Sequence, residues 1–281
     1  MTERTYRTGK LPKRSDPRTL QMRRYLDRAA LLPIPAACDY SGLPEPWGLL
    51  GNDQTGDCTC AGLAHANMLW CWWGEDERYQ PTDAAVIATY AAISGYNPSD
   101  PGSDRGAVML DVLKYWQRKG LEGHRIGPYA EIAPDDAQTW RRAIYEFGCV
   151  YLGALLPDEV LPRGETVLDW TVTSGKPRPR NGHTVIAVGY DAKGVDIVSW
   201  GRLLRASWVF VEKYADEAYA VLDPEWATNA PPGLRADQLQ ADLDLVRSVP
   251  APVHTSPPFG CLPTFGLGRL IVALRMRRRL K

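Results

Sequence analysis

Two short stretches of the chain carry the residue types of a thiol-based hydrolytic site. The first is Asn52-Asp53-Gln54-Thr55-Gly56-Asp57-Cys58, in which a cluster of turn-forming residues ends at a cysteine. A mostly apolar run from Cys58 to Trp73 follows, and it predicts a buried helix that begins at this cysteine, with Asp57 as its N-cap. A helix N-terminus lowers the pKa of a thiol and so favours the nucleophilic thiolate.

The second stretch supplies a base. His183 follows a loop rich in Pro and Gly and begins the apolar run to Tyr190, which predicts a strand that holds the imidazole rigidly. Asn52 and Gln54 lie just upstream of Cys58, and with the backbone N–H of Cys58 they are candidate donors for an oxyanion. The chemistry that these residues predict is attack of the thiol on a carbonyl carbon, with the imidazole taking the proton.

The elements that must position these residues change character along the chain. Helices are predicted first, and short strands with β-branched or aromatic residues follow. This order predicts an α+β fold with two sides to a cleft. The predicted helices are 82–94, 108–119 and 134–146, and the predicted strands are 149–156, 183–190, 194–200, 206–211 and 219–222.

The order of these blocks resembles that of papain-like cysteine peptidases. Residues 182–190 read Gly-His-x-Val-x-x-Val-Gly-Tyr, and Ser199-Trp200-Gly201 matches the family's Asn-Ser-Trp-Gly segment without its Asn. The resemblance covers about Leu50 to Val221 and points to a bacterial or phage-encoded member. It implies two lobes, a helical lobe carrying the Cys helix and an antiparallel β lobe carrying the His. It also implies hydrolysis of peptide or isopeptide bonds through Cys58 and His183, without a metal or an organic cofactor.

The resemblance leaves the identity of the nucleophile open between two cysteines. The family places an oxyanion Gln six residues before its Cys, and Gln54 lies six residues before Cys60, whereas Asn52 lies six residues before Cys58. We favour Cys58, because Gly56-Asp57 forms the helix cap directly before it. The small residues Ala61 and Gly62 would then let the helix pack closely behind the site.

The third residue of the family's site is not matched. The Asn that orients the imidazole falls at Val198, which cannot accept a hydrogen bond from the ring. Asp196, two residues earlier on the same face of the strand, is one substitute, and Ser199 is another if the strand slips by one residue. The mismatch supports an alternative function, a catalytically weak or inactive module that serves as a structural or binding subunit of a larger assembly such as a phage particle.

Charge is unevenly distributed over the 281 residues, although the net charge is zero. Residues 1–28 hold nine basic and three acidic residues, and residues 250–281 hold six basic residues and no acidic one. The basic ends are expected either to lie on the chain's own acidic body or to dock onto a protein assembly partner. The acidic body argues against nucleic-acid contact beyond these ends.

The sequence also predicts the domain organisation of the chain and its location in the cell. We expect a basic Pro-rich arm at 1–50, a papain-like domain at 51–225 and a C-terminal extension with a basic tail at 226–281. There is no run of 18 apolar residues and no apolar segment after the start, so we expect no membrane span and a cytoplasmic protein, or one incorporated in a virion or other assembly. Its six cysteines are then expected to be reduced, and its partner to be a peptide or protein substrate.

Overall fold

The structure is a computed structural model that describes residues 6–26, 32–43, 46–75, 77–172 and 174–224, together with positions 226 and 241. The chain divides into two units, Met1–Ser248 and Val249–Lys281, and the second lies wholly outside the described residues. The predicted basic C-terminal tail therefore lies outside them as well. Within the described residues, no helix has both the length and the apolar character needed to cross a bilayer.

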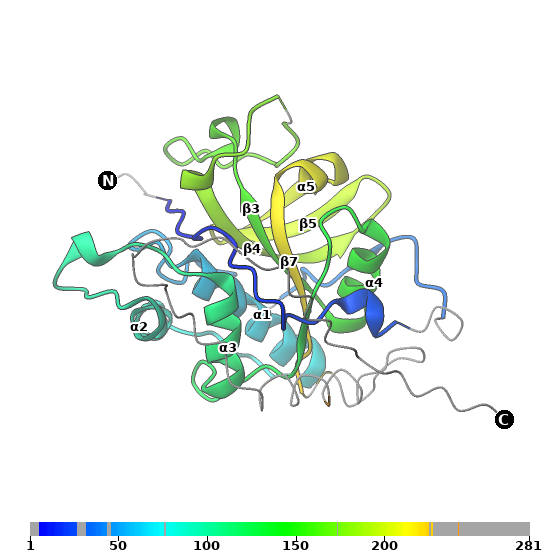
Figure 1. Cartoon of the computed structure of the whole chain (residues 1–281), viewed down its shortest axis with the longest axis horizontal. Coiled ribbons are helices and arrows are strands. Elements are labelled where there is room, and N and C mark those ends of the chain that lie inside the picture. Colours follow the sequence, from blue (N-terminus) through cyan, green and yellow to red (C-terminus); the bar gives the residue numbers. More distant parts are fainter. Residues whose placement is uncertain are drawn as a thin grey trace, which may run out of the picture. The chain divides into compact units, whose positions relative to one another are not determined.

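The helical part of the fold comes early in the chain, as the sequence predicts (Figure 1). The α-helices are α1 (Cys58–Glu75), α2 (Asp83–Ser94), α3 (Met109–Arg118), α4 (Ala137–Phe147) and α5 (Trp208–Tyr214). Short 3-10 turns occur at Met22–Arg24, Pro101–Ser103, Asp158–Val160 and Pro179–Asn181. The first of these turns lies in the N-terminal arm, and residues 27–31 after it lie outside the described residues.

The β part is a seven-stranded antiparallel sheet in the order β2-β7-β3-β4-β5-β6, with β1 paired to β4 beside this path. The strands are β1 (Cys38–Asp39), β2 (Tyr129–Glu131), β3 (Val150–Leu155), β4 (Gly182–Tyr190), β5 (Gly194–Ser199), β6 (Arg202–Ser207) and β7 (Ala215–Val221). This helical part with an antiparallel sheet is the predicted α+β fold.

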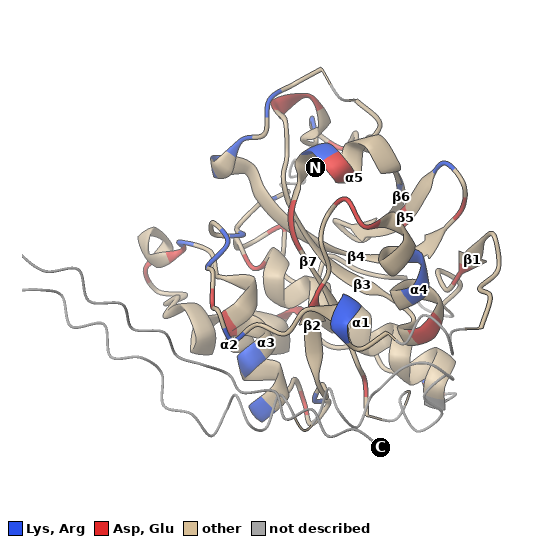
Figure 2. Ribbon diagram, turned by 45° about the vertical axis from the view of Figure 1, so that its right-hand side comes forward, with Lys and Arg blue, Asp and Glu red and all other residues tan. Residues whose placement is uncertain are grey.

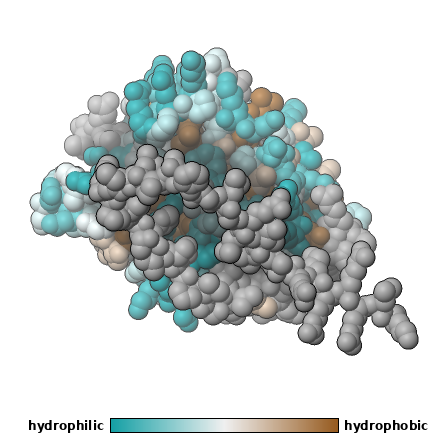
Figure 3. All heavy atoms as spheres, viewed as in Figure 1, coloured by the Kyte–Doolittle hydropathy of each residue, from teal (hydrophilic) through white to brown (hydrophobic). Residues whose placement is uncertain are grey.

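Both faces of the sheet are covered, and β4 shows why. Every residue of β4 is buried, and alternate side chains enter two different hydrophobic cores. Val185 and Ala187 pack with α4 and α5, whereas Ile186 and Val188 pack with α1. An uninterrupted apolar strand is the expected sequence for such a position. The visible described surface is mainly hydrophilic in the view of Figure 3.

The start of α1 lies where the sequence predicts it, although among the described residues the Asp57 carboxylate makes no cap hydrogen bond. The carbonyl of Asp57 accepts the backbone N–H groups of Cys60 and Ala61, at 2.7 and 3.0 Å, so Asp57 stands at the N-cap position. Gly62 lets the helix pack closely, because an added Cβ would lie 3.2 Å from the Tyr151 ring. The first turn of α1 is therefore held tightly against β3 and β4.

One predicted strand is wrong. Residues 206–211 alternate in a way typical of a strand, yet β6 ends at Ser207 and α5 begins at Trp208. The hydroxyl of Ser207 accepts the backbone N–H of Phe210 at 3.1 Å, which is an N-cap bond. Phe210 and Val211 are then buried on one face of a short helix, so tertiary packing overrides β propensity here.

Candidate active site

The two predicted stretches meet in one small cavity. Cys58, at the first position of α1, and His183, at the second position of β4, line a cavity of about 10 Å³ together with Asn52. This volume holds one water molecule at most. The described residues show no direct hydrogen bond between the thiol and the imidazole, but Thr184, next to His183, lines the same cavity as the thiol.

The Cys58 thiol is almost fully buried, with 1% of the residue exposed. Burial raises the pKa of the thiol to about 12, because a thiolate loses its hydration there. Hydrogen bonds from the backbone of Thr184 and of Gly9 lower the pKa, but by less than burial raises it. In this state Cys58 is a neutral thiol at neutral pH.

The His183 ring is held on several sides. Its Nε2 lies 3.0 Å from Ser199 Oγ, and its plane stacks on the Trp200 ring with centroids 4.3 Å apart. Its Nδ1 is buried and has no hydrogen-bond partner among the described residues. Burial lowers the pKa of His183 to about 3, so the ring is neutral at neutral pH.

The structure separates the alternatives left by the sequence around Cys58. Asn52 is buried in the cavity wall, where its Nδ2 donates to the Thr55 carbonyl at 3.2 Å. Gln54 instead lines a separate surface hollow with Asp83 and neighbouring residues of α2. Cys60 is fully buried in the core on the α1 side of the sheet and does not line the cavity. Cys58 and Asn52 are thus brought together with His183, whereas Gln54 and Cys60 are not.

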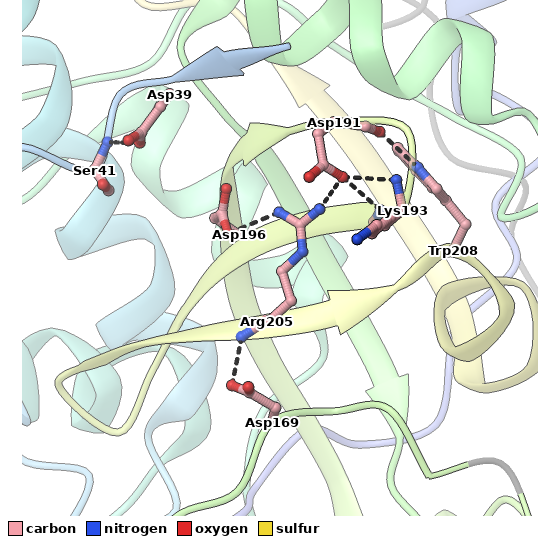
Figure 4. A network of polar contacts seen from close by, with 9 residues as sticks. Asp39, Ser41, Asp169, Asp191, Lys193, Asp196, Arg205 and Trp208 are labelled. Carbon is pink, nitrogen blue, oxygen red and sulfur yellow. Dashed lines mark hydrogen bonds and ion pairs between the residues drawn. The ribbon is translucent and has the colours of Figure 1, made fainter.

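The structure does not bring Asp196 to the imidazole. Asp196 is paired with Gly189, six residues along β4 from His183, beyond an irregularity between Ala187 and Gly189. Its carboxylate accepts from Arg205 at 2.8 Å, in a network that also includes Asp191 (Figure 4). The residue that contacts the ring is therefore Ser199, the second substitute considered, while Val198 lies in the cavity wall.

The N-terminal segment lies beside this cavity and runs between the helices and the sheet (dark blue in Figure 1). The backbone N–H groups of Gly9 and Lys10 donate to the Gly182 carbonyl at 3.0 and 2.9 Å, next to His183. Trp200 Nε1 donates to the Arg7 carbonyl at 3.0 Å, over the stacked imidazole. The segment therefore joins the site through backbone atoms.

The same segment is also hydrogen-bonded on the helical side, to the loop before α3. The N–H of Ala107 donates to the Gly9 carbonyl, and the N–H of Leu11 donates to the Ala107 carbonyl, both at 2.9 Å. These bonds form a parallel bridge between Lys10 and Ala107, in the loop before α3. We call residues Tyr6–Leu11 the cleft segment, because they are bonded to both sides of the cleft.

Gly9 is the closest point of this contact. A Cβ at Gly9 would lie 1.8 Å from the Gly56 carbonyl oxygen, and a Cβ at Gly106 would lie 2.0 Å from the Gly9 oxygen. Neither overlap is tolerable, so the cleft segment fits only while both positions are glycine. The sequence analysis did not predict this fit. The feature of the sequence that could have indicated it is the glycine at position 9 inside a basic, Pro-rich arm.

The basic residues of the N-terminal segment pair with acids of the chain's own body, which is one of the two alternatives predicted from charge. Lys13 forms an ion pair with Glu131, and Arg14 forms one with Asp111 of α3. Over the described part of the chain, basic and acidic residues are interspersed in the view of Figure 2. The second alternative, a partner for the basic ends, remains a prediction for the C-terminal end.

A second Cys–His contact lies elsewhere in the chain. Cys71 Sγ lies 3.5 Å from His124 Nδ1, and the His124 ring packs on Tyr79 with centroids 4.1 Å apart. Cys71 is in the last turns of α1, where the helix dipole does not favour a thiolate. His65, which lines the cavity, is a wall residue, because its Nε2 contacts the carbonyls of Trp47 and Gly48 at 3.0 and 3.1 Å.

Comparison with known proteins identifies the fold. No model of a known protein family matches the chain, and no curated protein sequence matches it. Among solved structures, xylellain, a cysteine protease from Xylella fastidiosa, is similar with a TM-score of 0.62 and 16% identity, over 79% of this chain and 98% of that chain.

Two further solved structures are similar. Digestive procathepsin L2 from the Tenebrio molitor larval midgut has a TM-score of 0.55 and 13% identity, over 77% of this chain and 78% of that one. The ragweed pollen cysteine protease Amb a 11 in its proform has a TM-score of 0.53 and 15% identity, over 74% of this chain and 71% of that one. The structural neighbours are papain-like cysteine proteases, and the chain has the papain-like fold.

Proposed function

We propose that the chain is a papain-like cysteine hydrolase that cleaves peptide or isopeptide bonds through Cys58 and His183. The imidazole Nδ1 takes the proton of the Cys58 thiol, and the thiolate attacks the carbonyl carbon. The backbone N–H of Cys58, which has no partner within α1 because it belongs to the first turn of the helix, and Asn52 Nδ2 stabilise the oxyanion. His183 then gives the proton to the leaving amine, and water hydrolyses the thioester.

The observation that carries this proposal is the state of the two imidazole nitrogens. Nε2 is engaged by Ser199, while Nδ1 is buried without a hydrogen-bond partner in the described part of the chain, and His183 lines the same cavity as Cys58. One nitrogen is thus held for orientation, and the other is left to exchange a proton with the thiol. Ser199 takes the orienting role that the resemblance assigns to an Asn at the position of Val198.

We propose further that this is a latent form. With the cleft segment in place, burial raises the pKa of Cys58 to about 12 and lowers that of His183 to about 3, so the thiolate–imidazolium pair is disfavoured. The cavity also has no room for a peptide carbonyl. Two of the similar structures are a procathepsin and a proform, which supports reading the cleft segment as a removable block.

The test is alkylation of the full-length protein with iodoacetamide at mildly acidic pH, with the modified cysteine identified by peptide mapping. A variant in which the cleft segment is displaced should be modified at Cys58 at least about 100 times faster than free cysteine thiols under the same conditions, because an activated thiolate reacts below the usual thiol pKa. The same variant carrying His183→Ala should lose this rate advantage.

The alternative function, a structural or binding module, makes the opposite prediction. The absence of an Asn at Val198 is the feature that favours it. If displacement of the cleft segment exposes Cys58 and the thiol still reacts only as fast as an ordinary cysteine, the hydrolase proposal fails. The cleft would then act as a binding groove.

A further inference from the structure

The side chain of Lys10 leaves the cleft segment and enters a buried acidic pocket. Its Nζ lies 2.8 Å from Asp216 Oδ2 and 2.9 Å from Glu217 Oε1, both on β7. The side chains of Lys10 and Glu217 have no exposed surface, and that of Asp216 is 20% exposed. Lys13, just beyond the cleft segment, by contrast, pairs with Glu131 at a site where its side chain is 31% exposed.

The pocket has room for Lys10 because β3 carries a glycine beside it. A Cβ at Gly153 would lie 2.3 Å from Lys10 Cε and 2.5 Å from Met109 Sδ. The aliphatic part of Lys10 therefore passes between Gly153 and Met109 and carries the ammonium group to the carboxylates. Tyr219 donates to the other oxygen of Glu217, Oε2, at 2.9 Å, which fixes that carboxylate in the pocket.

An occupant of this pocket must carry positive charge. Glu217 is a buried carboxylate, and removing its cation leaves a buried charge without compensation. Asp216 adds a second acidic group at the same point, and its Oδ1 is buried without a hydrogen-bond partner among the described residues. A neutral side chain of similar length would fill the space but leave both carboxylates uncompensated.

The pocket lies next to the proposed reaction centre. The backbone of Gly9 in the cleft segment lies close enough to the Cys58 thiol to lower its pKa, and Lys10 is the following residue. The N–H of Lys10 donates to the Gly182 carbonyl, beside His183. A peptide that lies in the cleft in place of this segment presents one of its side chains to the same pocket, within about two residues of the carbonyl that Cys58 attacks.

We infer that Asp216 and Glu217 form a specificity pocket that selects substrates with a lysine side chain near the scissile bond, and that Lys10 is the internal mimic of that side chain. The inference rests on the proposed function and names the substrate class of the same site. Glu217 and Asp216 bind the substrate ammonium group, and Gly153 gives the pocket its depth.

The first experiment releases the pocket in the full-length chain by Lys10→Glu, which places a third negative charge against Asp216 and Glu217. The alkylation rate of Cys58 should rise about 100-fold over that of the unmodified protein, because expulsion of Lys10 removes the segment that buries the thiol. Lys13→Glu is the matched control, with the same charge change outside the pocket, and should change the rate less than about threefold. Equal effects of the two variants would overturn the inference.

The second experiment measures selectivity of the Lys10→Glu protein on quenched fluorescent octapeptides, in which each position in turn is lysine or norleucine. One position within two residues of the cleaved bond should prefer lysine by about 100-fold in kcat/KM, because norleucine keeps the length but lacks the charge. Adding Glu217→Gln, which keeps size and the Tyr219 contact, should reduce this preference at least tenfold. A lysine preference that survives Glu217→Gln, or no preference at all, would overturn the inference.

A binding measurement separates this inference from the proposed function. A fluorescent synthetic peptide of residues 6–13 and its norleucine-10 version are titrated into the Lys10→Glu protein that also carries Cys58→Ala. The lysine peptide should bind about 100 times more tightly, and Gly153→Ala should abolish the difference by filling the pocket. If this holds but no peptide is cleaved and Cys58 is unreactive, the hydrolase proposal fails and the pocket stands. If peptides are cleaved without a difference in binding, the pocket inference alone fails.

Discussion

Two neighbouring regions under the same segment are both closed to solvent, yet they are built on opposite electrostatic principles. Around Cys58 and His183, burial keeps both groups neutral, with pKa values of about 12 and about 3. Around Lys10, burial is compatible with charge, because the ammonium group meets two carboxylates within 3 Å. Groups that must carry opposite charges to react are held apart from each other and neutral, whereas groups that only bind are held together in an ion pair.

The difference shows how the cleft segment is retained. At the reaction centre it is held by backbone hydrogen bonds and by the close fit of Gly9 between Gly56 and Gly106. One residue later it is held by an ion pair. Steric change should therefore release the first contact and charge change the second, and either should free the cleft if the segment acts as one unit.

The largest effect is expected from removing the thiol itself. In a protein with the cleft segment displaced, Cys58→Ala should lower peptide hydrolysis by at least about 10⁴-fold, because no other group supplies the nucleophile. Cys60→Ala is the matched control two residues away and should change the rate less than twofold. Hydrolysis that persists in Cys58→Ala but is lost in Cys60→Ala would place the nucleophile at Cys60.

Steric release should have the next largest effect. Gly9→Val places a side chain where a Cβ alone would already lie 1.8 Å from the Gly56 oxygen, so the segment cannot remain seated. The alkylation rate of Cys58 should rise about 100-fold or more. Gly42→Val is the control, because a Cβ there would meet nothing closer than the Trp73 ring at 4.0 Å. An unchanged rate in Gly9→Val would show that the segment does not block the thiol.

Sequence reasoning recovered the parts of this arrangement that local patterns specify. The turn before Cys58 and the apolar runs of α1 and β4 have local signals in the sequence. The resemblance to papain-like cysteine peptidases then predicts how these elements combine in one fold. For the cleft segment the sequence predicts only a basic Pro-rich arm, since the position of the segment depends on the hydrogen bond between Gly9 and Gly182, which are far apart in the chain. The pocket for Lys10 was missed for the same reason, because Gly153, Glu217 and Lys10 meet only in the folded chain.

The orientation of the imidazole should have an intermediate effect. Ser199→Ala removes the hydroxyl 3.0 Å from Nε2, and it should lower kcat of the displaced form about 10- to 100-fold with little change in KM, because the ring loses orientation rather than substrate contact. Asp196→Asn should change kcat less than twofold, since its carboxylate faces Arg205. The reverse ranking would return the orienting role to Asp196.

Lowering the pH should open the cleft segment around Cys58 and His183 without any substitution. An imidazole freed by opening regains a pKa near 6.5, whereas burial holds that of the closed His183 to about 3. Above pH 6.5 both forms are neutral and closure is unaffected. As the pH falls from 6.5 towards 3, only the open form binds the proton, so the open population should rise by up to about tenfold per pH unit.

Hydrogen exchange of the Gly9, Lys10 and Leu11 amides, corrected for intrinsic rates, measures this opening between pH 7 and 4.5. His183→Asn should flatten the dependence. His65 lines the same cavity, and burial lowers its pKa to about 4. Opening that exposes His65 is therefore also favoured as the pH falls. The variant His65→Asn therefore separates the two contributions. A pH dependence that both variants retain would place the titrating group outside the cavity.

The smallest effect is expected from the residue that precedes Cys58. Burial raises the pKa of the Asp57 carboxyl well above its usual 3.8, so the folded chain loses stability as pH rises from 3.8 through that higher value, because the unfolded chain ionises first. Asp57→Asn keeps the shape and removes this penalty. The free energy of unfolding at pH 7, measured by urea titration, should rise by about 1 kcal/mol. Because Asp57 also raises the pKa of Cys58 through its charge, the variant should react slightly faster with iodoacetamide at high pH. A loss of stability at pH 7 instead would mean that Asp57 is ionised in the fold, and that the region around Cys58 is held together by charge as the Lys10 pocket is.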